Sequence, residues 1–269
     1  MVNRLKKAIR TLFVEENAGR SVTVFDDDIF IVSYPKSGNT WVRFLVANVV
    51  YKDRQVNFGS IERLVPDIYQ HSDFFIRCVS RPRFIKSHEY FDPRYKRVLY
   101  IVRDPRDVVV SYWYYKVKIR EIKDGFPMDE FVDRFVSGDL DPFGSWGDNV
   151  GSWLGARKYS SNFMLVRYED LSSDPVLVTK KIVQFFGLAR NEKDIISAVN
   201  NSSINHMKDL EKKDGQNWKP MKKARSDIPF VRQGSVGGWK NVLSDVSVAK
   251  IENSWRELLV ELGYDVGEG

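Results

Sequence analysis

Residues 29–41 of this 269-residue chain read Ile-Phe-Ile-Val-Ser-Tyr-Pro-Lys-Ser-Gly-Asn-Thr-Trp. The apolar, β-branched run over Ile29–Tyr34 predicts a strand buried on both faces, and the pattern from Trp41 to Tyr51 predicts a helix after it. A loop that leads from a strand into a helix N-terminus presents free backbone N–H groups, and the helix dipole favours an anion there. The stretch therefore predicts an α/β fold with an anion site at the end of its first strand.

The loop between this strand and this helix carries donors of its own. Gly38 lets the backbone approach a ligand closely, and its neighbours add side-chain donors: Lys36, Ser37, Asn39 and Thr40. The loop is P-loop-like but lacks the pattern G-x-x-x-x-G-K-[ST], because it has one glycine and its lysine precedes that glycine. An ordinary capped turn is the alternative, since Ser, Asn and Thr are also common helix caps.

More strand-then-helix units follow along the chain. Strands are predicted over Val98–Val102 and Phe163–Val166, with a weaker one over Arg83–Ser87. Such repetition predicts a mainly parallel central sheet flanked by helices. No repeat or linker divides the chain, so residues 1–269 are predicted to form a single domain with residues 1–25 as an N-terminal extension. The other expected helices are Pro105–Lys123, Met128–Val136, Asn149–Tyr159, Val176–Phe186, Glu192–Val199 and Val248–Leu262.

The end of the second strand carries a candidate phosphate ligand. Ligands of an open parallel sheet collect at the carboxyl ends of its strands. Arg103 follows this strand and has the planar fork that suits a phosphate, and Ser111 lies two turns along the next helix. The alternative is a structural cluster in which Arg103 and Arg106 pair with Asp104 and Asp107.

Lys86 and His88 lie two positions apart at the end of the weaker strand, and hence on one face. A histidine with an ordinary pKa of about 6.5 accepts a proton at neutral pH, so His88 is a candidate base. A surface or internally satisfied histidine is the alternative. Neither H-E-x-x-H nor C-x-x-C occurs, so no metal site is predicted.

Residues 202–241 are polar, basic and interrupted by proline and glycine, and they are predicted to form a long loop. Loops of this length in a compact domain are usually functional or mobile. Arg232 offers a charge clamp and Gly234 a flexible backbone, so the segment is expected to cover a ligand; a solvated surface loop is the alternative. Tyr168, after the third predicted strand, is a candidate to contact an adenine ring.

Composition narrows the class of protein. The chain has 42 Lys+Arg against 36 Asp+Glu, a net charge of +6 that suggests an anionic partner. Cys78 is the only cysteine, which favours a reducing, cytoplasmic location. No apolar stretch is long enough to span a membrane, and the basic N-terminal segment, with helical spacing over Leu5–Phe13, lacks the features of a secretion signal.

In chain order, these motifs resemble the sulfotransferases of the cytosolic type. The resemblance implies transfer of the sulfuryl group of 3'-phosphoadenosine-5'-phosphosulfate (PAPS) to a hydroxyl or an amine of a small-molecule acceptor. PAP would be released, and no metal would take part. The matching stretches are Tyr34–Trp41, Lys86–His88, Arg103 with Ser111, Arg167–Asp170 and Arg232–Asn241.

The resemblance also implies a role for each matching residue. His88 would be the catalytic base, and Lys36, Lys86 and Ser111 would assist the transfer, with Lys36 at the leaving oxygen. The loop of residues 36–41 would hold the 5'-phosphosulfate. The 3'-phosphate would contact Arg103, Ser111, Arg232, Gln233 and Gly234, and the adenine would contact Trp41, Tyr168 and Ser202.

Two departures from the family pattern affect binding and assembly. Gln233 stands where the family often has a lysine, which removes a positive charge from the 3'-phosphate site. The family's dimerisation motif would start at Lys240, but Asp245 and Ala249 interrupt it, so the oligomeric state stays open.

Two other functions fit parts of the sequence. A nucleotide-dependent phosphotransferase, a kinase on a P-loop-like core, is the alternative enzyme, but the chain lacks a Gly-Lys-[Ser/Thr] motif and an evident Mg²⁺ carboxylate pair. A nucleic-acid binder would fit the net charge and the 13% aromatic content. The five ordered motifs favour the sulfotransferase, and nucleic acid is not an expected partner.

Overall fold

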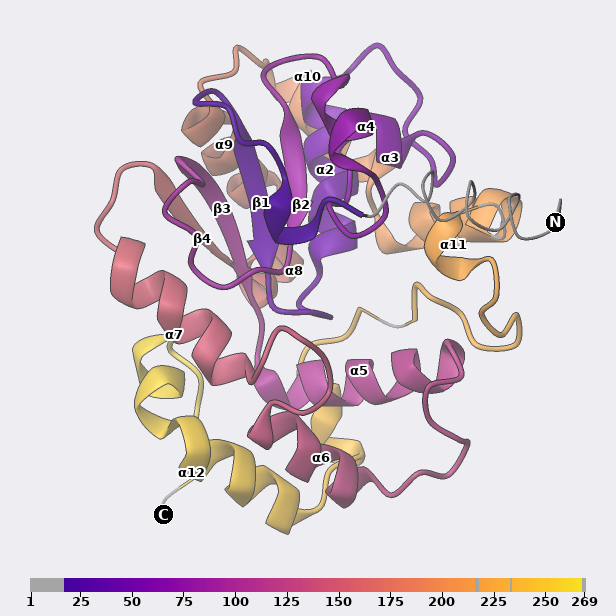
Figure 1. Cartoon of the computed structure of the whole chain (residues 1–269), viewed down its shortest axis with the longest axis vertical. Helices are drawn as coiled ribbons and strands as arrows, with labels where there is room; N and C mark the ends of the chain where they lie inside the picture. Colours follow the sequence, from indigo (N-terminus) through magenta and orange to yellow (C-terminus); the bar gives the residue numbers. More distant parts are fainter. Residues whose placement is uncertain (1–16, 216–217, 233, 268–269) are drawn as a thin grey trace, which may run out of the picture.

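A four-stranded parallel sheet lies at the centre of the chain (Figure 1). The computed structural model describes residues 17–215, 218–232 and 234–267. The strands are β1 (Ile29–Ser33), β2 (Phe84–Ser87), β3 (Arg97–Val102) and β4 (Phe163–Arg167), in the order β2-β1-β3-β4. β1 pairs with β2 on one side and with β3 on the other, so the strand order changes direction at β1. In an open α/β sheet, ligands bind at the carboxyl ends of the strands at such a point.

Every residue of β1 is buried, which explains its unbroken apolar sequence. Alternate side chains enter two separate cores: Phe30 and Val32 enter one, while Ile29 and Ile31 enter the other. Phe30 and Ile31 are both 0% exposed, and burial of such a side chain stabilises the fold by about 1.5–3 kcal/mol. The sheet is therefore covered on both faces.

Helices from different parts of the chain cover the two faces (Figure 1). The core around Phe30 is closed by helices α5, α6, α7 and α12, and the core around Ile31 by α2, α9, α10 and α11. The larger helices are α2 (Asn39–Val50), α5 (Pro105–Lys118), α6 (Met128–Ser137), α7 (Trp146–Arg157), α9 (Pro175–Phe186), α10 (Glu192–Asn201), α11 (Ile204–Asp214) and α12 (Asp245–Glu261). The shorter ones are α3 (Ile61–Leu64), α4 (Asp73–Arg77), α8 (Tyr168–Ser173), η1 (Gly19–Ser21), η3 (Lys219–Met221) and η4 (Gly238–Asn241).

The predicted α/β class and parallel sheet are confirmed, and the local signals agree with most element ends. Helix α5 starts at Pro105, and the Asp104 side chain caps it by accepting from the backbone N–H of Arg106. The helix stops at Lys118, five residues before the predicted end at Lys123. Helix α9 ends where Gly187 adopts a left-handed conformation at φ 68°, as its sequence predicted.

The prediction of a loop over residues 202–241 is partly wrong. Helix α11 occupies Ile204–Asp214, with the Ser203 side chain as its N-cap and Met207 and Leu210 in the core. Two short helices, η3 and η4, lie in the rest of the segment. The apolar residues at positions 204, 207 and 210 were too few to stand out in a polar, basic stretch. The segment after α11 runs back towards α5 (Figure 1), where Lys118 Nζ donates to the carbonyl of Arg225 at 2.9 Å.

The basic N-terminal segment with its expected helix lies outside the described residues, as does Gln233. Within residues 17–215, 218–232 and 234–267, no helix combines the length and apolar character that a membrane crossing needs.

Candidate active site

The loop after β1 has an unusual backbone. Lys36 adopts φ 66°, which is rare for a residue with a side chain, and Gly38 adopts φ 98° at the N-cap of α2. A Cβ atom added to Gly38 would lie 2.5 Å from Cδ2 of Tyr168, so only glycine fits against that ring. Strain of this kind is often stored at binding sites. The strained backbone is therefore typical of a binding loop rather than of an ordinary capped turn.

Three buried polar atoms around this loop have no hydrogen-bond partner among the described residues. They are Ser37 Oγ, Asn39 Oδ1 and Arg103 Nε. The amide of Asn39 is nevertheless fixed, since its Nδ2 donates to the carbonyl of Ile31 at 3.3 Å and to Ser33 Oγ at 3.2 Å. A buried donor without a partner costs about 1–3 kcal/mol, which an anionic ligand would relieve at Ser37 and Arg103. The donor set fits a phosphate or sulfate group.

Lys36 lies between two aromatic rings. Its Nζ is 4.2 Å from the ring centroid of Tyr115 and 4.5 Å from that of Phe230. Burial, together with the positive charges of Arg103 and neighbouring cations, lowers the pKa of Lys36 to about 7. The ammonium thus lacks a carboxylate partner in the described chain, and a bound anion would favour its charged form.

Two arginines reach the same region from different elements. The Arg103 guanidinium lies 4.3 Å from the ring centroid of Tyr168 and donates to the carbonyl of Ser235 at 2.9 Å. The alternative ion-pair cluster is present in part: Arg106 pairs with Asp104 at 2.7 Å, whereas Arg103 Nη2 is 3.9 Å from Asp107. The Arg232 guanidinium lies 4.2 Å from the ring centroid of Tyr114. Both arginines therefore keep most of their donors available to a ligand.

His88 follows β2 and is held in one tautomer. Its Nδ1 lies 2.7 Å from the carbonyl oxygen of Ser33, and because a carbonyl only accepts, Nδ1 carries the proton and Nε2 is left as the acceptor. The amide of Asn149 donates to the His88 carbonyl at 2.9 Å. Burial, and then the charge of Lys86, lower the pKa of His88 well below its ordinary value. The ring is therefore neutral at neutral pH, with Nε2 unprotonated.

Lys86 is paired with a carboxylate. Its Nζ lies 2.5 Å from Asp67 Oδ2, and both side chains are largely buried. The backbone N–H of Tyr69 donates to the other Asp67 oxygen at 2.9 Å. This pair orients Lys86 beside His88, and nothing in the Lys86-to-His88 spacing predicted Asp67 as its partner.

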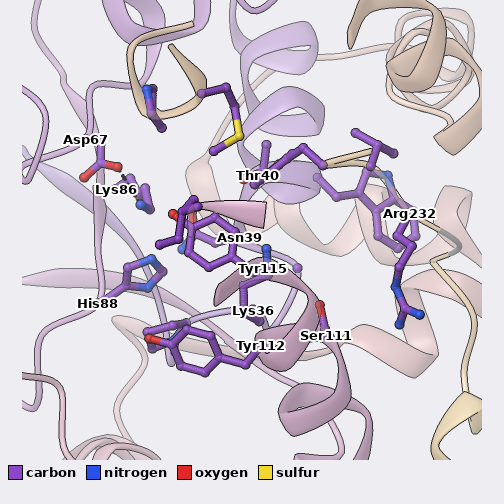
Figure 2. A pocket seen from close by; sticks show the side chains of 18 of the residues that line it. Lys36, Asn39, Thr40, Asp67, Lys86, His88, Ser111, Tyr112, Tyr115 and Arg232 are labelled. Atoms are coloured by element: carbon purple, nitrogen blue, oxygen red, sulfur yellow. Dashed lines mark hydrogen bonds and ion pairs between the residues drawn. The ribbon is translucent and has the colours of Figure 1, made fainter. Parts of the chain in front are cut away.

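A cavity of about 490 Å³ joins these groups. Figure 2 shows His88 and Lys86 on one side of it, Arg232 on the opposite side and Lys36 between them. Most of the site residues predicted from sequence line this cavity: Lys36, Gly38, Asn39, Thr40, Trp41, Lys86, His88, Arg103, Ser111, Tyr168, Arg232 and Gly234.

Two predicted residues lie elsewhere. Ser202 is 0% exposed and is not among the lining residues; its hydroxyl donates to the carbonyl of Ala198 at 2.7 Å and accepts from Asn48 at 3.1 Å. Ser37 is also absent from the lining, although its buried hydroxyl lacks a partner in the described chain. The Ser202 hydroxyl is thus committed to the fold of α10.

Several lining residues escaped the sequence reasoning, because no local motif marks them. Ile204 approaches Gly234, where an added Cβ would lie 2.2 Å from its Cδ1, and it lines the cavity near Trp41 and Tyr168. Trp41 and Tyr168 meet edge to face at 5.3 Å between ring centroids. The other missed residues that matter below are Asp67, Tyr69, Tyr112, Glu121, Asp141, Phe143 and Phe230.

The described residues contain no group of three or more His, Cys, Asp or Glu side chains arranged to hold a metal ion.

Comparison with known proteins identifies relatives along most of the chain. The family model of the sulfotransferase domain matches residues 26–263. Rat Sulfotransferase 1E1 is 27% identical over 256 residues, which cover 86% of this chain and 82% of the relative. Mouse Sulfotransferase 2B1 is 30% identical over 258 residues, covering 89% of this chain and 73% of the relative.

Solved structures with the same fold extend this likeness. Mouse sulfotransferase SULT7A1 complexed with PAP is 25% identical, with a TM-score of 0.71 over 90% of this chain and 87% of that one. Retinol dehydratase in complex with androsterone and PAP is 17% identical, with a TM-score of 0.72 over 93% of this chain and 85% of that one, and at that identity it shows the fold alone.

Proposed function

Because the chain belongs to the sulfotransferase family, we propose that it transfers the sulfuryl group of PAPS to a hydroxyl of a small-molecule acceptor. One observation carries this proposal. A single cavity holds cations that have few carboxylate partners, together with a neutral histidine whose Nε2 is free to accept a proton. An anionic donor and a hydroxyl acceptor need such groups on opposite sides of the transferred atom.

The cations at one end support binding of the two anionic parts of PAPS. The loop of residues 36–41 would hold the 5'-phosphosulfate, since Lys36, Gly38 and Thr40 line the cavity where α2 begins. Arg103, Ser111 and Arg232 would hold the 3'-phosphate, and Arg103 Nε is unpartnered in the described residues. Gly234 and Gln233 adjoin Arg232 in the chain and complete this part of the proposal.

The edge-to-face pair of Trp41 and Tyr168 supports an adenine site beside the loop. In this proposal Ile204 takes the place that the sequence suggested for Ser202, because the Ser202 hydroxyl is fully used within α10. Segment 202–241 acts as the cover of the co-substrate, since Phe230 and Arg232 line the same cavity. Residues 26–263 would thus work as one catalytic domain.

His88 would act as the general base on the acceptor side. As the acceptor oxygen bonds to sulfur, its proton passes to His88 Nε2 and the bond between sulfur and the bridging phosphate oxygen breaks. Lys36 would stabilise the negative charge that develops on that leaving oxygen, and PAP is released. Lys86, fixed by Asp67 next to His88, would steady the transferring group, and Ser111 would orient the donor.

A small molecule fits the acceptor role. The retinol dehydratase neighbours hold androsterone or retinol, which are small molecules of this general kind. A cytoplasmic location stays a prediction that rests on the single cysteine.

Calorimetry with PAP and mass spectrometry of acceptor mixtures test the proposal. We expect PAP to bind, and we expect a mass gain on at least one hydroxylated acceptor with PAPS and without Mg²⁺. In parallel reactions, ATP with Mg²⁺ should give no product. Product formed from ATP, with no binding of PAP, would instead support the phosphotransferase alternative.

A further inference from the structure

The cavity holds an uneven set of charges. Three carboxylates line it, Asp67, Glu121 and Asp141, along with two lysines, Lys86 and Lys116, and Figure 2 shows Asp67 and Lys86 on the His88 side. Lys86 is paired with Asp67 at 2.5 Å, and Lys116 is paired with Glu121. Within residues 17–215, 218–232 and 234–267, Asp141 forms no ion pair. One carboxylate of the cavity is therefore left without a cation.

Asp141 is fixed in place but not saturated. Its Oδ1 accepts from the backbone N–H of Phe143 at 2.7 Å, and its Oδ2 accepts from the hydroxyl of Tyr112. A carboxylate has about four acceptor positions, so capacity remains for another donor. Burial raises the pKa of Asp141 to about 6, which still leaves it largely ionised at neutral pH. Burying such a charge without a cation is costly, and a cationic ligand would offset that cost.

Aromatic rings connect the turn of Asp141 to His88. The ring centroids of Tyr69 and Phe143 are 5.0 Å apart, and His88 lies 6.0 Å from Tyr69 and 5.5 Å from Phe143. Phe143 is two residues from Asp141 and donates its backbone N–H to that carboxylate, so the carboxylate and this aromatic group belong to one turn. Aromatic faces attract ammonium groups, and the attraction grows when water is excluded.

The Tyr112 side chain connects this turn to the reaction centre. Tyr112 follows Ser111 on α5, and Figure 2 shows its hydroxyl end on the His88 side of the cavity. Asp141, bonded to that hydroxyl, therefore lies at the acceptor side, away from Arg232. The cavity is positive where an anionic donor would bind and negative where the acceptor would bind.

We propose that the acceptor is a hydroxylated amine whose ammonium group binds Asp141, beside the contacting rings of Phe143 and Tyr69, while its hydroxyl faces His88. This inference rests on the proposed sulfuryl transfer, and it names the class of acceptor.

Matched acceptor pairs test the inference. We would compare 4-(2-aminoethyl)phenol with 4-propylphenol, and 6-aminohexan-1-ol with heptan-1-ol, using PAPS as the donor. In each pair a methyl group replaces the ammonium. A charge-assisted hydrogen bond contributes about 1.5–3 kcal/mol, so the wild-type kcat/KM should favour the amine by about 10-fold or more in at least one pair.

Two variants separate the role of Asp141 from a general effect of charge. Asp141→Asn keeps the shape of the side chain but removes its charge, and we expect it to abolish most of the preference for the amine. Asp139→Asn is the matched control, because Asp139 is exposed, lies two residues away and bonds to Ser137. The control should keep the wild-type preference, and the affinity for PAP reports that each variant is folded.

The outcomes distinguish this inference from the proposed function. If wild-type enzyme turns over the uncharged acceptor of both pairs as well as or better than the amine, the inference is wrong while sulfuryl transfer stays intact. The same holds if the preference for the amine survives in Asp141→Asn. If neither pair is turned over, binding of each member to the PAP-loaded enzyme decides: tighter binding of the amine supports the inference, and equal binding overturns it. Failure to bind PAP at all would instead contradict the proposed function.

Discussion

At one end of the cavity, Lys36, Arg103 and Arg232 lie over aromatic rings, and among the residues that the structure describes only Arg103 of the three approaches a carboxylate, at 3.9 Å. At the other end, Lys86 is held 2.5 Å from Asp67. An aromatic face holds a cation without neutralising it, whereas a carboxylate does neutralise it. The first arrangement leaves charge for an incoming anion, and the second fixes a side chain beside the base.

The histidine at the acceptor end should give the largest effect. We expect His88→Ala to lower kcat by about 100- to 10,000-fold, because the acceptor loses its general base. The affinity for PAP should change little, since His88 lies on the acceptor side. Measuring kcat and the affinity for PAP tests whether the cavity has separate donor and acceptor ends. The exposed His206→Ala is the control. Full activity in His88→Ala would remove it as the base.

The unpaired lysine should matter more than the paired one. We expect Lys36→Ala to lower kcat by about 100- to 1,000-fold, because the charge on the leaving oxygen loses its stabilising cation. PAP binding should weaken as well, and Lys86→Ala should show the smaller loss in binding. Steady-state kinetics and calorimetry on both variants, with the exposed Lys213→Ala as control, measure the difference. Equal losses of PAP affinity in Lys36→Ala and Lys86→Ala would contradict the expected difference between an unpaired and a paired cation.

Arg232 should act on binding more than on rate. Loss of a charge-assisted contact to a phosphate costs about 1.5–3 kcal/mol, so we expect Arg232→Ala to weaken PAP binding by about 10- to 100-fold. The exposed Arg63→Ala should leave the dissociation constant unchanged. Calorimetry at two salt concentrations measures both variants, and an unaltered affinity in Arg232→Ala would exclude it from the 3'-phosphate site.

The smallest effect concerns the pH profile. Burial is the main cause of the lowered pKa of His88, and the charge of Lys86 is the second. Removing that charge in Lys86→Gln should raise the pKa of His88, so protonation would disable the base at a higher pH than in the wild type. The acid limb of kcat/KM should therefore move to higher pH. The exposed Lys96→Gln should not move the limb, and a shift to lower pH in Lys86→Gln would contradict this coupling.

The sequence predicted the parts of the site that lie within continuous motifs. The β1 loop, Arg103 and His88 follow strand ends, and parallel strands bring their carboxyl ends to one edge, so their meeting at a single cavity follows from the fold class. The prediction for Ser202 rested on a match in sequence alone. Its hydroxyl instead closes a turn of α10, because a buried hydroxyl near a helix end readily bonds to the carbonyl four residues earlier.

The sequence by itself determined the α/β class, the strand positions and the anion loop, since these depend on local periodicity and on neighbouring residues. Tertiary structure alone decided which side chains share the acceptor end. Asp67 pairs with Lys86 across a bridge between distant segments, and the turn of Asp141 and Phe143 meets Tyr69 and His88 through contacts 55 or more residues apart in the chain. Such contacts depend on packing of both sheet faces and not on local pattern, so they leave no motif in the sequence.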